Sequence, residues 1–149
     1  MRILKKALLV ALLLGAGLAL AARASAETQQ FGAYEVHYSV FVSSFLQPAV
    51  AESYGIVRAR DRAVLNIAVR LRGRDGATRA VASTLDGTRG DLIYKEALRF
   101  REIREQDVVY YLADFPFIEG ETHYFDIRVR PEGETGELGL QFSKTLYED

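Results

Sequence analysis

The chain has 149 residues, of which 19 are basic and 20 are acidic, and it contains no cysteine. The absence of cysteine excludes disulfide bridges, thiolate metal sites and cysteine nucleophiles. A formal net charge of −1 at pH 7 gives no basic surplus of the kind that nucleic-acid-binding domains carry, so we expect no nucleic-acid partner.

The first 26 residues have the three parts of a secretory signal peptide. Arg2, Lys5 and Lys6 form a charged start, residues 7–22 form an uncharged apolar run, and Ala24-Ser25-Ala26 is a small-x-small cleavage site. As a helix the apolar run rises about 24 Å, which is short of the ~30 Å hydrocarbon core, so it favours a cleaved signal over a membrane anchor. We therefore expect export to the periplasm, cleavage after Ala26 and no transmembrane segment in the mature protein.

The mature chain, residues 27–149, is predicted to form a single domain. Its length lies in the common size range of single domains and suffices for a core without disulfide bridges. Cleavage removes basic residues and no acid, which makes the mature domain more acidic than the full chain.

The first predicted strand covers residues 31–42, where apolar and polar residues alternate in the order expected of a strand buried on one face. The alternation stops at Ser44. Pro48 suits a first helical turn and Gly55 suits the left-handed position that ends a helix, so residues 48–54 predict a short helical crossover. The sequence leaves open whether this crossover changes sheets.

Residues 61–72 predict the central strand of the fold. Its apolar residues recur at every second position: Ala63, Leu65, Ile67, Val69 and Leu71. This period is typical of a β-strand. Val64 and Ala68 bracket Asn66 on the other face, so we expect the strand to be partly covered on both sides.

Turn signals and alternation continue to the end of the chain. Residues 73–76 predict a turn, with residues 77–85 as the hairpin partner, and Asp86-Gly87 and Arg89-Gly90 predict the next break. Further strands are predicted over residues 92–104, 108–115, 122–130 and 138–146, with turns or loops at 105–107, 119–121 and 131–136.

About seven strands and one short helix, without a helical pattern long enough for a βαβ unit, predict an all-β antiparallel two-sheet sandwich. An immunoglobulin-like or fibronectin-III-like arrangement fits best, and a small closed barrel is the alternative. Tyr124 lies near the position of a tyrosine corner, but Phe125, Ile127 and Val129 define the inward phase, so Tyr124 points the other way.

Three segments carry a family resemblance. They are QFGAYEVHYSVF near the mature start, the Pro48 to Gly55 segment with SYGI, and RARDRAVLNIAV. In this order they resemble the bacterial exported family catalogued as domain of unknown function 4426. The resemblance implies a small exported bacterial protein, and it implies no catalytic residues, because the family has no settled activity.

The two histidines, His37 and His123, are the first candidates for chemistry. A metal site would need a third ligand beside them, and Glu35 or Asp126 are the candidates. No spacing demands such a site, so we expect exposed or hydrogen-bonded structural histidines, no metal and no cofactor.

The sequence contains no Gly-x-Ser-x-Gly elbow, no phosphate-binding Gly-rich loop and no His-Glu-x-x-His helix. A pair of acids for sugar cleavage remains open, because the separation that matters is spatial. We therefore keep a carboxylate- and histidine-dependent hydrolase on a sandwich scaffold as the alternative to a non-enzymatic protein.

Arginines gather between residues 58 and 79, at Arg58, Arg60, Arg62, Arg70, Arg72, Arg74 and Arg79. The only acids in this stretch are Asp61 and Asp75. Guanidinium groups suit phosphates and carboxylates, although a solvated strand face is the simpler explanation. Arg70, Arg72 and Arg74 occupy every second position, so they lie on the same side of the predicted strand and continue into the turn. They are the leading candidates for a binding site.

Asn66 and Tyr38 complete the candidate binding residues. An amide in the middle of a buried strand must be hydrogen-bonded, so Asn66 is expected to tie the strand to a loop, with ligand contact as the alternative. Tyr38 belongs to a rich set of aromatic residues that fill the core or line a groove. These features favour a non-enzymatic periplasmic binding or accessory module that recognises an anionic envelope component or a protein partner.

Overall fold

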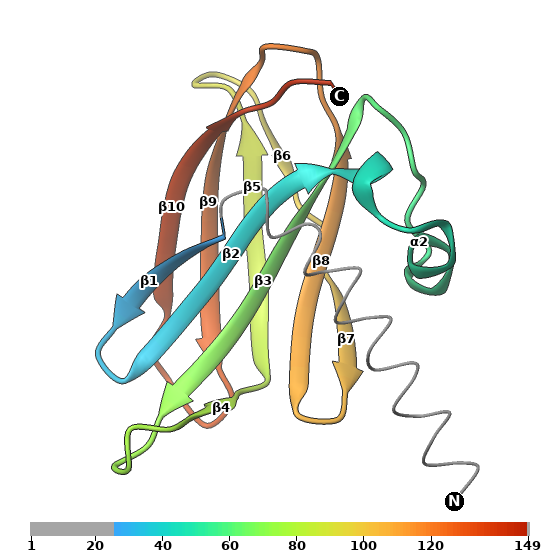
Figure 1. The fold of residues 1–149 in the computed structure, drawn as a ribbon. Coiled ribbons are helices and arrows are strands. Elements are labelled where there is room, and N and C mark those ends of the chain that lie inside the picture. Colours follow the sequence, from blue (N-terminus) through green and yellow to red (C-terminus); the bar gives the residue numbers. More distant parts are fainter. Residues whose placement is uncertain (1–25, 149) are drawn as a thin grey trace, which may run out of the picture.

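Two antiparallel β-sheets pack against each other in the computed structural model, which describes residues 26–148 (Figure 1). The β3 sheet has the order β1 (Glu27–Phe31), β2 (Tyr34–Val42), β3 (Arg62–Arg72), β8 (Val108–Pro116), β7 (Arg101–Glu105), with β4 (Thr78–Ala80) paired to β3. The β9 sheet has the order β10 (Leu138–Thr145), β9 (Thr122–Pro131), β5 (Ser83–Gly90), β6 (Lys95–Ala97). This arrangement confirms the predicted two-sheet antiparallel sandwich.

The core lies between the sheets and follows the alternation of the sequence. On β3 the inward residues Ala63, Leu65, Ile67 and Val69 are at most 1% exposed. Across the core, Phe125, Ile127 and Val129 of β9 are equally buried, while Tyr124 faces outward as predicted. Strand β3 lies between β2 and β8, which confirms its predicted central position.

The outer face of the β3 sheet is covered at one end by the connection from β2 to β3. This connection contains the short helices η1 (Ser43–Phe45) and α2 (Pro48–Tyr54). Val50, Ala51 and Tyr54 pack on Val64 and Leu112, so β3 has apolar neighbours on both faces at this end. Helix α2 starts at Pro48 and ends at Gly55 in the left-handed conformation, as predicted. Because β2 and β3 are neighbours in one sheet, the crossover does not change sheets.

Residues 26–148 form ten strands rather than the predicted seven. The predicted first strand starts only at Tyr34, because Gly32 and Ala33 form a turn that allows β1 to pair with β2. The predicted hairpin partner of the central strand shrinks to the three residues of β4, after which the chain crosses to the β9 sheet as β5.

The break predicted at Asp86-Gly87 and Arg89-Gly90 lies further along the chain, since β5 runs through Gly87 and ends at Gly90, and the turn follows at residues 91–94. A Cβ atom at Gly87 would lie 2.6 Å from the carbonyl oxygen of Asp126 on β9. This glycine therefore allows close approach of two strand backbones rather than a turn.

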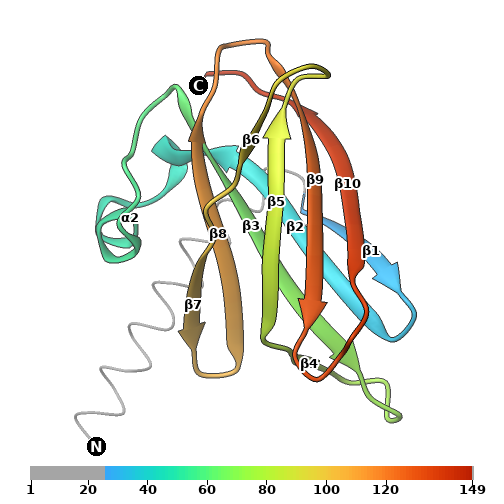
Figure 2. The same ribbon diagram turned by 180° about the vertical axis from the view of Figure 1, so that it is seen from behind.

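The strand predicted over residues 92–104 is wrong as a single element. It is divided into β6 in the β9 sheet and β7 in the β3 sheet, and the segment between them passes from one sheet to the other (Figure 2). Leu98 lies in this crossing segment, and its side chain is buried in the core between the sheets.

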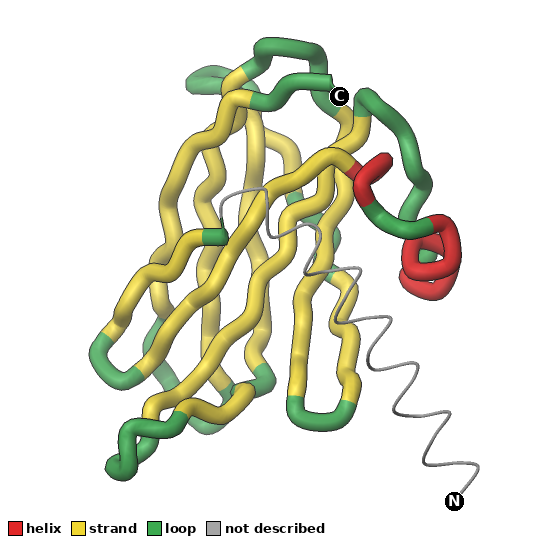
Figure 3. The backbone as a smooth tube through the Cα atoms, in the orientation of Figure 1, coloured by secondary structure: helices red, strands yellow, loops and turns green. Residues whose placement is uncertain are grey.

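The loops gather at two opposite ends of the sandwich (Figure 3). The end we call the loop end holds the β5–β6 turn (91–94), the β8–β9 loop (117–121) and residues 146–148 after β10. The β3–β4 turn (73–77) lies at the other end (Figure 1). The predicted signal peptide and its membrane-anchor alternative fall almost entirely outside the described residues. Within residues 26–148 no helix has the length and hydropathy needed to cross a membrane.

Candidate functional site

Two of the three candidate arginines are bound within the β3 sheet. Arg70 donates from Nε to the hydroxyl of Thr78 at 2.8 Å and from Nη2 to the carbonyl oxygen of the same residue at 2.9 Å. Arg72 forms an ion pair with Glu35 on β2. Arg74 lies exposed in the β3–β4 turn and makes no side-chain hydrogen bond within the described residues. Only Arg74 of this group therefore presents an uncommitted guanidinium.

The other arginines near the central strand also hold parts of the fold together. Arg58 donates to the carbonyl oxygens of Leu46 at 2.6 Å and Ser44 at 2.9 Å, which fixes the connection that contains α2. Arg62 pairs with Asp114 on β8 at 2.6 Å. Four of the seven clustered arginines, Arg58, Arg62, Arg70 and Arg72, are thus engaged in separate structural contacts.

Asn66 and Tyr38 lie on opposite faces of the β3 sheet, so the structure does not bring them together. The Oδ1 atom of Asn66 is buried without a hydrogen-bond partner in the described structure, and the expected tie from this oxygen to a loop is absent. Tyr38 packs its ring on Phe142 at a centroid distance of 4.4 Å and donates its hydroxyl to Glu27 at 2.9 Å. Burial, followed by the Glu27 contact, raises the pKa of Tyr38 to about 12.

The two histidines belong to different sheets and do not converge on a shared site. His37 on β2 is hydrogen-bonded through Nδ1 to Thr28 at 2.9 Å and through Nε2 to Glu35 at 3.1 Å. His123 on β9 faces the core, where its Nε2 lies 3.0 Å from a carboxylate oxygen of Glu121. Among residues 26–148 no three His, Asp or Glu side chains are grouped closely enough to hold a metal ion.

His123 is a titratable group buried in the core. It is 1% exposed, its Nδ1 atom has no partner, and its ring lies 5.4 Å from that of Phe115. Arg89 is stacked over the same phenyl ring at 4.9 Å and pairs with Glu96 at 2.8 Å. Burial lowers the pKa of His123, and Arg89 lowers it further, whereas Glu121 acts in the opposite direction.

We expect this burial to make folding stability depend on pH. An unfolded chain binds a proton at His123 near pH 6.5, whereas the folded protein resists protonation until the pH is lower. The free energy of unfolding should therefore fall as the pH drops below about 6.5. Urea denaturation between pH 7.5 and 5.5 measures this slope, which should decrease in His123→Gln. The variant His37→Gln, which removes the other histidine of the sequence, is the matched control. An unchanged slope in His123→Gln would contradict the assignment.

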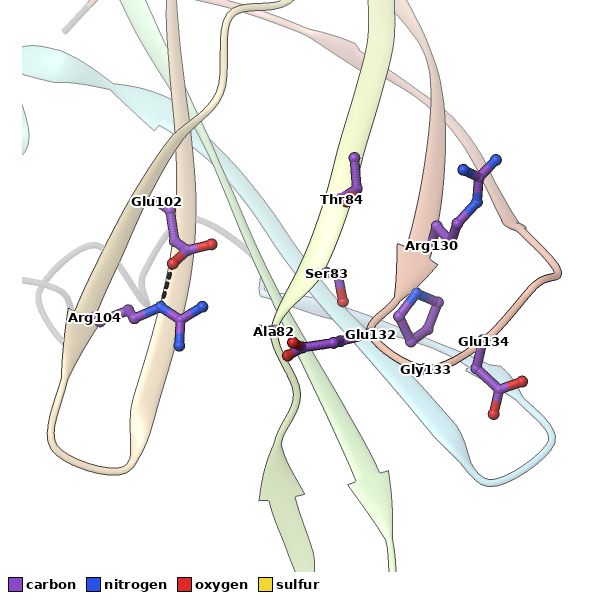
Figure 4. A pocket seen from close by; sticks show the side chains of 10 residues that line it. Ala82, Ser83, Thr84, Glu102, Arg104, Arg130, Glu132, Gly133 and Glu134 are labelled. Atoms are coloured by element: carbon purple, nitrogen blue, oxygen red, sulfur yellow. Dashed lines mark hydrogen bonds and ion pairs between the residues drawn. The ribbon is translucent and has the colours of Figure 1, made fainter.

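A pocket of about 360 Å³ opens at the end opposite the loop end. It lies between the β7–β8 hairpin, the start of β5 and the β9–β10 turn (Figure 4). Charged side chains of opposite sign lie close together in this pocket. Glu102 is paired with Arg104, and the carboxylate of Glu132 also stabilises the charged form of Arg104. Neither this pocket nor a hollow on the outer face of the β9 sheet contains a histidine. Neither offers the acid and histidine arrangement that the alternative hydrolase would need.

An exposed apolar tip lies at the loop end of the sandwich. Leu92, Ile93 and Tyr94 in the β5–β6 turn are 76%, 81% and 76% exposed. Asp91 fixes the shape of this turn, because its Oδ1 accepts the backbone N–H groups of Ile93 at 2.7 Å and Tyr94 at 2.6 Å. These two backbone hydrogen bonds also lower the pKa of Asp91. The three apolar side chains are therefore presented to solvent by an ordered turn.

Ile118 and Tyr147 are two further exposed apolar residues. They belong to the β8–β9 loop and to the segment after β10, and both of these segments lie at the loop end (Figures 1 and 2). The segments that carry them are joined by hydrogen bonds from Gly120 N to Leu146 O at 2.7 Å and from Leu146 N to Glu121 O at 3.0 Å. We call Leu92, Ile93, Tyr94, Ile118 and Tyr147 the apolar rim. The sequence analysis missed it, although three consecutive apolar residues directly after Gly90-Asp91 were a usable signal.

Comparison with known proteins places this architecture in a family. The family model described as Domain of unknown function (DUF4426) matches residues 28–149. The chain belongs to this family. It is similar to the crystal structure of a DUF4426 family protein from Pseudomonas aeruginosa PAO1, with 36% sequence identity and a TM-score of 0.72, over 83% of this chain and 96% of the other. No curated protein matches the chain. The DUF4426 resemblance noted in the sequence is confirmed, and function must be argued from the geometry of this chain.

Proposed function

We propose that this DUF4426 protein is an exported, non-catalytic binding module that docks through its apolar rim onto a protein partner in the cell envelope. The observation that carries the proposal is the ordered tip formed by Leu92, Ile93 and Tyr94. Large apolar side chains that are held out into solvent are typical of interaction surfaces. Because Asp91 already fixes the turn, binding costs little additional conformational entropy.

The charges around the rim favour a protein over an anionic membrane surface. Asp91, Glu119, Glu121 and Glu148 belong to the same end of the molecule. Anionic lipids attract basic segments and are repelled by acidic ones. Interfaces between proteins, in contrast, commonly have a polar border around an apolar centre, so acidic residues around the apolar rim are compatible with a protein partner.

Site-specific photo-crosslinking in the periplasm tests the docking surface. A photoreactive residue at Ile93 should yield a discrete crosslinked product, and the matched control at Arg130, which lies toward the opposite end, should not. The product at Ile93 should disappear when Leu92 and Tyr94 are both replaced by serine, with an unchanged melting temperature. Equal products at both positions would contradict the proposal.

Binding of an anionic envelope component is the competing outcome. Vesicles that contain phosphatidylglycerol are the probe, and Arg74→Gln is the matched variant because Arg74 is the uncommitted guanidinium of the β3–β4 turn. The competing outcome is vesicle binding that weakens as the salt concentration rises and is lost in Arg74→Gln. If this binding also persists in the serine variants of the rim, the β3–β4 turn and not the rim is the binding surface.

Export is tested separately by intact-mass measurement of the protein recovered from the periplasm. We expect a mature species that begins at Glu27, because Ala24-Ser25-Ala26 matches the small-x-small pattern of a cleavage site. A soluble mature species that retains residues 1–26 would contradict both the cleavage and the proposed route.

A further inference from the structure

A second surface lies on the outer face of the β9 sheet, next to the apolar rim, with which it shares Leu92. It is a hollow of about 420 Å³, bordered by Leu92 and Lys95 and lined on the sheet by Tyr124, Asp126, Gln141 and Ser143. The register explains how these side chains come together. Ser143 of β10 and Gly90 of β5 lie on either side of Tyr124, and Gln141 and Thr88 lie on either side of Asp126.

The ring of Tyr124 is accessible because of its neighbours. Gly90 has no side chain, and Ser143 has a short one, so neither can cover the ring from the adjacent strands. Tyr124 is accordingly 41% exposed. This provides a flat aromatic surface beside a hollow.

The polar side chains on the sheet side of this hollow are not hydrogen-bonded to other described residues of the protein. Within the described residues, the side chains of Tyr124, Asp126, Gln141 and Ser143 make no hydrogen bond. The next row along the sheet differs, because Arg128 and Asp86 are paired there at 2.5 Å. The hollow therefore offers a carboxylate, an amide and two hydroxyls that are free to bind a ligand.

This combination matches the surface of a sugar ring. The C–H face of a pyranose packs on an aromatic ring as other apolar groups do, and its hydroxyls are donors and acceptors for carboxylate, amide and hydroxyl groups. Two acids, Asp91 and Asp126, face the single cation Lys95, so the local charge disfavours an anionic ligand. We propose that the outer face of the β9 sheet binds a neutral saccharide, with Tyr124 as the stacking platform and Asp126 and Gln141 as hydrogen-bonding groups.

Nuclear magnetic resonance titration of the ¹⁵N-labelled mature protein tests this site. The probes are cellotetraose, maltotetraose and chitotetraose, which are uncharged and differ in ring linkage and substitution. At least one should shift the backbone amides of residues 88, 124–126 and 141–143 in a saturable manner. Tyr124→Ala and Asp126→Asn should each lower its affinity by about tenfold. The matched control Tyr147→Ala removes another exposed tyrosine and should leave the affinity unchanged.

Two outcomes would overturn the inference. The first is the absence of localised shifts with all three probes at about 10 mM. The second is tighter binding of tetragalacturonate than of every neutral probe, since a preference for an anion contradicts the charge argument. The variant Tyr94→Ser separates this site from the proposed docking surface, because it should reduce photo-crosslinking at Ile93 and leave saccharide binding intact; Tyr94 does not line the hollow.

Discussion

Replacing Ile67 with aspartate should prevent the domain from folding. Ile67 is 0% exposed at the middle of β3, where it pairs in register with Tyr38 on one side and Tyr111 on the other. An unpaired carboxylate in such a position costs at least several kcal/mol, which is comparable to the ~5–15 kcal/mol of total stability of a domain. Circular dichroism and thermal denaturation should show no cooperative unfolding transition.

The matched control for this variant is Ile67→Val, which keeps the site apolar. We expect it to fold and to lose about 0.5–1.5 kcal/mol of stability. A folded Ile67→Asp protein with an unchanged melting temperature would mean that the register of β3 is displaced by one residue, because such a slip exchanges the two faces of a strand.

Replacing Gly90 with alanine should also have a severe effect. A Cβ atom at this position would lie 2.0 Å from the carbonyl oxygen of Tyr94 and 2.9 Å from the Cα atom of Lys95. Both are backbone atoms, so the β5–β6 hairpin must shift to accommodate the methyl group. We expect a loss of about 3 kcal/mol in urea denaturation, accompanied by loss of the rim crosslink at Ile93.

Gly139→Ala is the control for Gly90→Ala, because it adds the same methyl group to a strand of the same sheet. An added Cβ atom at Gly139 on β10 meets nothing within 4 Å. Its stability should change by no more than about 0.5 kcal/mol. Equal losses in the two variants would show that general strand effects, and not the contact with Tyr94, determine the result at Gly90.

Strand alternation predicted the inward faces of the core strands correctly. The inward residues assigned on β3 and β9 are those that pack in the core, because burial on one face of a strand imposes a period of two on the sequence. The helix over residues 48–54 was equally predictable, since proline and glycine have specific backbone preferences at its two ends.

One error in the fold came from a glycine. The sequence analysis took Gly87 as a turn signal, but the residue lies inside β5 and allows the backbone of β9 to come close. A glycine that allows a turn and a glycine that allows close approach are identical in sequence. Only the position of the neighbouring strand distinguishes them.

The candidate binding residues show the same division. Arg70 and Arg72 were correctly placed on one face, but whether they are available depends on Thr78 and Glu35, which the strand register brings beside them. The apolar rim was missed because Leu92, Ile93 and Tyr94 are good strand residues, whereas in the structure the backbone N–H groups of Ile93 and Tyr94 donate to Asp91 and their segment is a turn.

The sequence by itself determined the all-β class, the central strand with its buried face, the short helix, the outward direction of Tyr124 and the family resemblance. These properties depend on local backbone preference and on burial, both of which act on neighbouring residues of the chain. The tertiary structure alone decided which strands share a sheet, where the chain crosses between sheets, which arginines are already paired, and that the Tyr124 hollow exists. These features depend on pairing between residues far apart in the chain. Such contacts produce no recurring pattern of residue types within one strand, so a single sequence does not reveal them.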